Sequence, residues 1–258
     1  MSGAHSHGMS TASLHVDADS VVHRLAAETK LVALIGFVIA VAATPRTEVV
    51  AFVVYFVSIW AVVFLARVPA AVVLRRLLVV VPFVIFALLI PFVGGGEKTS
   101  VAGLSLSVDG LWATWNILAK ASIGATASIV LSATTRVPDV LNGLTRLHVP
   151  RVLVAIIAFM MRYLDLLVQQ LARMRTSMTA RCHDPRWLWQ VKPIASSAGA
   201  LFVRSYERGE RVHQAMLARG YTGAMPDLDR RSATGAEWFR AITLPAVAAV
   251  TLGVAVFA

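Results

Sequence analysis

Long apolar stretches alternate with short polar connections along this chain, and five of the stretches resemble membrane-spanning helices. A helix needs about 20 largely apolar residues to cross a bilayer. The predicted spans cover about residues 31–43, 49–66, 77–93, 111–131 and 241–258. Pro82 and Pro91 fall in the third stretch, and lipid-embedded helices tolerate proline where neighbouring groups satisfy the freed carbonyls. The pattern predicts an all-α, polytopic membrane protein of about five transmembrane helices, with a long helical segment before the last span.

The long polar interval between the fourth and fifth spans carries its own apolar pattern. Apolar residues recur there in steps of four and three, which is an unbroken heptad stripe. The stripe consists of Leu153, Ile157, Met160, Leu164, Leu167, Leu171, Met174 and Met178. One further step reaches Arg181, so the sequence predicts one helix of roughly 45 Å with an arginine at its end. The first part, VLVAIIAFMM, is apolar nearly all round, and it suits either the membrane surface or burial by other spans.

A second helix is predicted for about residues 196–219. Ser205 and Gly209 form a small-x-x-x-small pair, which allows two helices to cross closely. Gly220 is suited to the position just beyond the helix end, because glycine readily adopts the left-handed conformation found there. A second arginine, Arg219, therefore lies at a helix end. Arginine at a helix C-terminus is also a common cap, so the position alone does not establish a function.

Composition and charge give the orientation. Of the residues, 57% are apolar and 15% are charged, and the net charge is +10. With the N-terminus in the cytoplasm, 21 Lys and Arg lie inside and 2 outside, which agrees with the positive-inside rule. The basic residues cluster beside apolar spans, which favours lipid headgroups over nucleic acid as their partners. We expect an inner-membrane protein with a polar cytoplasmic tail (1–25), spans one to four (26–133), cytoplasmic helices (134–240) and a last span (241–258).

Signals for catalysis and metal binding are weak. The GGGEKT sequence from Gly94 lacks the Gly-Lys pair of a phosphate-binding loop. Cys182 is the one cysteine, the predicted spans contain no Asp, Glu or His, and we expect neither a cofactor nor a metal site. Lys120 lies within the fourth span. It either lines a cavity facing a partner, or snorkels or bonds backbone carbonyls between helices.

Four stretches carry a resemblance to a known family. They are HRLAAETKLVAL at 23–34, RYLDLLVQQLARMR at 162–175, SAGALFVRSYERGERVHQAMLARGYTG at 197–223, and the pair of Ala-Arg-x motifs. From His23 onward the chain resembles the transmembrane T component of energy-coupling factor (ECF) transporters, most closely the cobalt-type CbiQ family. The resemblance implies a non-catalytic scaffold that holds a membrane S component against two ATP-binding ATPase subunits. For the cobalt type it implies a cobalt-binding, CbiM-like S component.

The resemblance also assigns roles to residues. It implies that coupling helices dock in ATPase grooves through Ala180 and Arg181, and through Ala218, Arg219 and Gly220. The first motif departs from the family pattern, since Cys182 stands where glycine is usual. The heptad stripe and the small-residue pair predict packing between the coupling helices through Leu164, Leu167, Leu171, Met174, Met178, Ser205 and Gly209. Alternatives are a T component for nickel or a vitamin, a stand-alone permease, and a membrane enzyme.

Overall fold

The computed structural model describes residues 16, 18–93, 98–101, 104–181, 192–223 and 233–257. Most of the predicted N-terminal tail and Cys182 therefore lie outside the described residues. The chain divides into two units. The bundle unit comprises the described residues of Leu14–Gly143 and Arg230–Ala258, and the hairpin unit comprises those of Leu144–Asp229.

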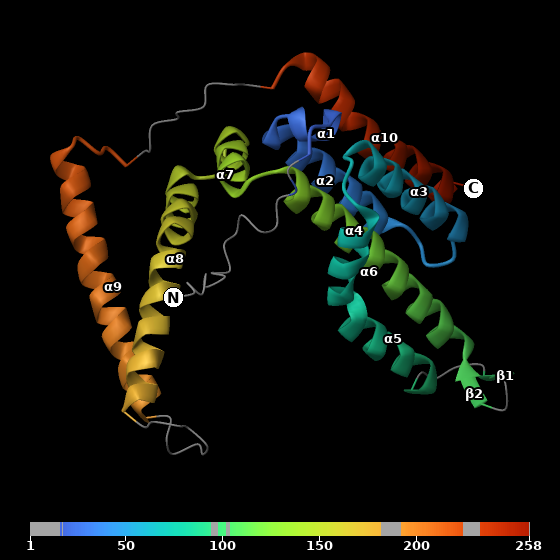
Figure 1. The fold of residues 1–258 in the computed structure, drawn as a ribbon. Coiled ribbons are helices and arrows are strands. Elements are labelled where there is room, and N and C mark those ends of the chain that lie inside the picture. The colour runs from blue at the N-terminus through green and yellow to red at the C-terminus, as the bar shows by residue number, and fades with distance from the viewer. Residues whose placement is uncertain are drawn as a thin grey trace. The chain divides into compact units, whose positions relative to one another are not determined.

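The predicted helical fold is confirmed, and each of the five predicted spans coincides with a helix (Figure 1). The bundle unit contains α1 (Val21–Arg24), α2 (Ala27–Ala43), α3 (Val49–Leu65), α4 (Ala70–Leu77), η2 (Leu78–Val80), α5 (Val81–Val93), α6 (Val108–Thr134) and α10 (Gly235–Phe257). Helix α7 (Val137–Arg146) comes after α6, and the hairpin unit contains α8 (Arg151–Ala180) and α9 (Lys192–Ala218). In the described part of the chain, four helical stretches have the length and composition to cross a membrane, namely Ala70–Phe92, Val108–Thr134, Arg151–Ala180 and Gly235–Val256.

Three details differ from the predictions. The helix of the third span begins at Ala70, after Pro69, and tightens into a 3₁₀ turn just before Pro82, whose nitrogen cannot donate to the helix. Helix α9 begins at Lys192 and holds Pro193 in its first turn, where proline is tolerated. Within the connection before α6, β1 (Lys98–Val101) and β2 (Leu104–Ser107) form a short antiparallel hairpin in which Lys98 pairs with Ser107.

The core of the bundle unit lies between α2, α3, α6 and α10. Tyr55 is fully buried, packs edge-on against Phe37 and Phe52, and donates a hydrogen bond of 3.3 Å to the carbonyl of Ala248. Much of the outer surface is apolar, as in Phe86 (71% exposed) on α5. An exposed apolar exterior around a packed interior is the pattern expected of helices in lipid.

Glycines set the closest helix approaches in this unit. A Cβ on Gly110 of α6 would lie 2.7 Å from the Cα of Pro91 in α5. Thr114, one turn further along α6, donates to the carbonyl of Ala87 at 2.7 Å. Helices α5 and α6 therefore pack with almost no side chain between them at this end.

Candidate functional site

The first predicted arginine, Arg181, is the C-cap residue of α8. Its backbone N–H donates to the carbonyl of Met178 at 3.1 Å, which closes the last turn. The side chain is exposed, and the described residues provide it with no ion-pair partner. The predicted helix end is confirmed here, whereas the turn at Cys182 lies outside the described residues.

The second arginine, Arg219, is held by a more fully bonded helix end. Gly220 comes next with φ of +81°, in the left-handed region, as the sequence predicts. The amide of Gly220 donates to Leu217 at 2.9 Å, and that of Tyr221 donates to Met216 at 3.0 Å. These two bonds make a Schellman motif, which fixes where α9 ends.

The two arginines do not meet. In the hairpin unit, α8 and α9 approach each other near the end of α8 (Figure 1). There the Ser197 hydroxyl donates to the sulfur of Met178 at 3.5 Å. Arg181 therefore lies near the start of α9, and Arg219 lies just past its far end. Helix α9 has 27 residues, which separates the two positions by roughly 40 Å along its axis.

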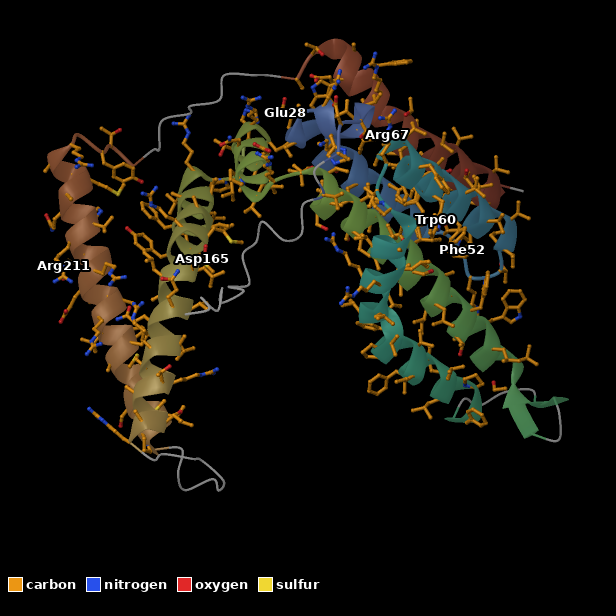
Figure 2. The ribbon with its side chains drawn as sticks, in the orientation of Figure 1. Glu28, Phe52, Trp60, Arg67, Asp165 and Arg211 are labelled. Carbon is orange, nitrogen blue, oxygen red and sulfur yellow. The ribbon has the colours of Figure 1, made fainter. Side chains whose placement is uncertain are left out.

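The heptad stripe of α8 divides into two parts. Leu167, Leu171, Met174 and Met178 are half-buried, on the part of the helix nearer α9. Leu164 (41% exposed) and Met160 (65% exposed) belong to the exposed part. Figure 2 shows side chains projecting along both helices, with Asp165 on α8 and Arg211 on α9.

The small-residue pair on α9 has no partner helix in the described part of the chain. Ser205 donates within its own helix to the carbonyl of Leu201 at 2.6 Å. A Cβ on Gly209 would meet nothing within 4 Å. The surface at Ser205 and Gly209 is thus open, and their predicted role in helix packing stays a prediction.

A polar cluster that the sequence analysis missed ties together one end of the bundle unit. Glu28, 7% exposed, accepts a hydrogen bond of 2.8 Å from the amide of Ala233, just before α10 (Figure 2). Lys30 donates to the carbonyl of Thr134 at 3.0 Å and to the Thr135 hydroxyl at 3.3 Å. The sequence contains one signal for this cluster, namely the two charged residues, Glu28 and Lys30, directly before an apolar span.

Helix α7 was also missed, although its sequence contains a signal. Apolar residues recur at Val137, Val140, Leu141 and Leu144, and Pro138 lies in the first turn, where it can open a helix. A Cβ on Gly143 would lie 2.9 Å from the amide nitrogen of Glu28, so α7 approaches the start of α2 closely.

The structure decides between the two interpretations of Lys120. Its ammonium donates to the carbonyls of Ala42 and Thr44 at 2.8 and 3.0 Å, at the C-terminal end of α2. Lys120 therefore bonds backbone carbonyls between helices. Lys30 does the same for the end of α6, so α2 and α6 each cap the other with a lysine.

Further polar groups near the N-terminus hold local structure. Arg24 donates two hydrogen bonds to the Asp19 carboxylate, at 2.8 and 2.6 Å, and this contact lowers the pKa of Asp19. Both side chains are exposed, so the pair is worth little in stability. Within the described ranges, no group of three or more His, Cys, Asp or Glu residues could hold a metal ion.

Several apolar spans, a packed interior and lysines that satisfy helix ends define a multi-pass helical membrane protein. The chain belongs to the CbiQ family, described as cobalt transport protein, because residues 18–228 match that family. The family comprises transmembrane T components of ECF transporters, which are non-catalytic transport subunits.

Individual relatives agree with this membership. The chain is 30% identical to the cobalt transport protein CbiQ of Rhodobacter capsulatus over 51% of its length and 54% of the relative's. It is 27% identical to the energy-coupling factor transporter transmembrane protein EcfT of Bacillus selenitireducens, over 81% of its length and 82% of the relative's. An uncharacterised protein of Methanocaldococcus jannaschii is 26% identical over 65% of this chain and 60% of its own length. The matched regions thus span little more than half of the Rhodobacter and Methanocaldococcus proteins.

Proposed function

We propose that this chain is the coupling subunit of an ATP-driven ECF importer, linking two ATPase subunits to a membrane S component. The observation that carries the proposal is the pair of exposed helix-end arginines, Arg181 and Arg219, which have no ion-pair partner in the described structure. In this proposal each arginine enters an acidic groove of one ATPase subunit. ATP hydrolysis takes place in those subunits.

The chemistry of arginine suits this role. A guanidinium stays charged at any physiological pH and can donate two parallel hydrogen bonds to one carboxylate. A helix end held by backbone hydrogen bonds, as at Arg219, presents that group in a defined direction. Movement of an ATPase groove would then be transmitted along a stiff helix. The separation of the two arginines along α9 supports contact with two subunits.

The open surfaces of the hairpin unit support binding of further partners. Apolar residues such as Leu164 on α8 and Phe202 (72% exposed) on α9 face outward in the described structure. We assign the exposed part of the heptad stripe, with Ser205 and Gly209, to packing against the S component or membrane. The half-buried residues from Leu167 to Met178 are assigned to contact between the coupling helices.

We further propose cobalt as the substrate, selected by a CbiM-like S component. The family description and the name of the Rhodobacter relative support cobalt. Nickel or a vitamin is the alternative, because substrate choice would belong to the S component. Cells that express the chain with its ATPase and S subunits should accumulate radioactive cobalt, and omission of the chain should abolish uptake. Uptake of nickel or a vitamin in place of cobalt would overturn the substrate, and uptake without the chain would overturn the coupling role.

We propose that the N-terminus and the hairpin unit are cytoplasmic, in the inner membrane. The predicted cytoplasmic segments contain 21 Lys and Arg residues and the outer connections contain 2, and this excess supports the orientation. Helix α8 also has the length and composition to cross a membrane, which would favour a different placement of the hairpin unit. The mixed polar and apolar surface of the second half of α8 favours a position outside the hydrocarbon layer.

A further inference from the structure

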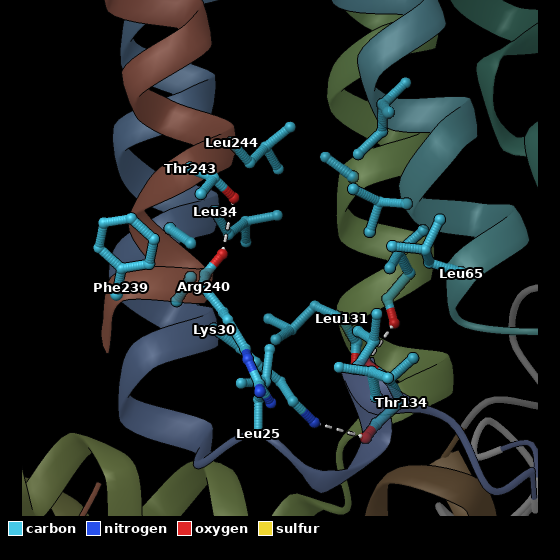
Figure 3. A pocket seen from close by; sticks show the side chains of 18 residues that line it. Leu25, Lys30, Leu34, Leu65, Leu131, Thr134, Phe239, Arg240, Thr243 and Leu244 are labelled. Carbon is cyan, nitrogen blue, oxygen red and sulfur yellow. Dashed lines mark hydrogen bonds between the residues drawn. The ribbon is translucent and has the colours of Figure 1, made fainter. Parts of the chain in front are cut away.

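The bundle unit contains an apolar cavity that the coupling role does not use. The cavity has a volume of about 300 Å³ and is lined by residues of α1, α2, α3, α6 and α10. Its walls are largely aliphatic, with Leu34, Leu131 and Leu244 among them (Figure 3). Ile59 of α3 also lines it. This volume is at the lower end of the range for small-molecule sites in proteins.

The charged groups on the cavity are all of one sign. Lys30 and Arg240 line it, and among the described residues no Asp or Glu does. Figure 3 shows both cationic side chains at the same end of the cavity. The ammonium of Lys30 is committed to its three oxygen acceptors, including the carbonyl of Thr134. Lys30 therefore contributes positive charge to the cavity, but all three N–H donors of its ammonium are already used.

Arg240 differs from Lys30, because its side chain is exposed and no hydrogen bond or ion pair of its guanidinium is found in the described structure. Glu237, one turn earlier on α10, is buried and accepts from the amide of Thr234 at 2.9 Å. The nearest acidic residue on the same helix is therefore engaged elsewhere. Arg240 has five N–H donors available for an anion.

The cavity adjoins the apolar exterior of the unit. Val21 (56% exposed), Leu65 (62% exposed) and Phe239 (76% exposed) line it and also form part of the outer surface. In a membrane protein such a surface is covered by acyl chains. The cavity also lies at the ends of α3 and α6 and near the starts of α2 and α10. The ends of helices that span a membrane are expected near the level where headgroups meet the hydrocarbon layer.

We propose that this cavity binds one anionic phospholipid, with an acyl chain against the aliphatic walls and the phosphate on Arg240. A soluble anion would gain nothing from the aliphatic walls. A zwitterionic lipid has the same phosphate, but its ammonium group would be repelled by the two cations. A membrane lipid with a net negative headgroup satisfies both. The proposal does not depend on ATPase coupling or on the transported substrate.

Lipid counting on the purified chain tests the proposal. The chain in detergent would be titrated with phosphatidylglycerol or phosphatidylcholine of identical acyl chains, and bound lipids would be counted by native mass spectrometry. We expect the first phosphatidylglycerol to bind roughly fivefold or more tightly than phosphatidylcholine, the effect of about one basic residue at a lipid surface. Arg240→Gln should remove this preference, whereas Arg75→Gln, an exposed arginine of α4 outside the cavity, should retain it.

A second pair of variants tests the acyl-chain site. Leu131→Trp, which fills the cavity, should weaken binding of the first lipid, and Leu88→Trp on the exposed surface of α5 should not. Equal binding of the two lipids would overturn the proposal, as would equal effects of Arg240→Gln and Arg75→Gln. Competition by glycerol phosphate at the concentration of the lipid would also overturn it, because that result would identify an anion site without an acyl chain.

Discussion

At the scale of single residues, the two helix-end arginines differ in the residue that comes next along the chain. Gly220 adopts φ of +81° after Arg219, and its motif fixes the end of α9. Cys182 comes after Arg181, and a residue with a Cβ enters the left-handed region at a cost of about 1–2 kcal/mol. The two sites are therefore not expected to be equivalent, and the end of α9 is the one with a glycine-dependent turn.

Gly220→Ala should loosen the end of α9, because alanine is strained at positive φ. The amides of Gly220 and Tyr221, which make the two closing bonds, should exchange with deuterium roughly five- to tenfold faster, as expected for about 1 kcal/mol. Gly209→Ala is the matched control, since Gly209 lies inside α9 in open space and alanine favours helix there. Equal exchange in both variants would show that the turn does not hold the helix end.

At the scale of helices, α2 and α6 are joined by reciprocal lysine contacts at their C-terminal ends. The last carbonyls of a helix lack partners within it and need a donor from outside. In lipid no water can serve that purpose, so the lysines have both a capping and a packing role. Neither lysine needs to touch a substrate for its position to be explained.

Lys30→Met should lower the stability of the chain in detergent, by about 1–3 kcal/mol, because it leaves buried acceptors unsatisfied at the end of α6. Lys120→Met should cost less, since it removes two hydrogen bonds at a more exposed site. Thermal unfolding measured by circular dichroism would rank the two variants. A Lys30→Met chain as stable as the unmodified one would mean that desolvation of the ammonium offsets its hydrogen bonds.

At the scale of the whole molecule, the sequence predicted the positions of helices well, but it did not predict contacts between residues far apart along the chain. Hydropathy located five apolar helices, and Gly220 located the end of α9, because both depend on neighbouring residues. The contact between Glu28 and Ala233 joins positions 205 residues apart, and no local pattern encodes it. The small-residue pair at Gly209 was recognisable from its spacing, but no described part of this chain packs against Gly209.

The orientation of the whole chain should place Thr47 outside and Ser177 inside the cell, because of the basic asymmetry. Both residues are exposed in the structure. Thr47→Cys and Ser177→Cys, each in a Cys182→Ser background, would be treated in whole cells with an impermeant thiol reagent. Only Thr47→Cys should be labelled before permeabilisation. Labelling of Ser177→Cys alone would reverse the orientation and place the proposed coupling helices on the wrong side for ATPase subunits.

Coupling through Arg181 and Arg219 is the central claim for the whole assembly, and a double variant tests it. Loss of one partner of a desolvated charge pair typically costs about 2–5 kcal/mol. The Arg181→Ala, Arg219→Ala chain should still insert in the membrane and retain its S component, because neither substitution lies in the bundle unit. It should nevertheless lose its ATPase subunits on purification and lose uptake in cells. Arg219→Glu should be more severe than Arg219→Ala, because it adds repulsion from an acidic groove.

The decisive measurement is the amount of ATPase subunit that co-purifies with this double variant, relative to the unmodified chain. Arg173→Ala with Arg211→Ala is the matched control, because both arginines are exposed but lie within α8 and α9, away from the helix ends. The account predicts loss of the ATPase subunits from the first pair and retention in the control. Full retention of ATPase subunits and uptake by the first pair would show that the two arginines are ordinary helix caps.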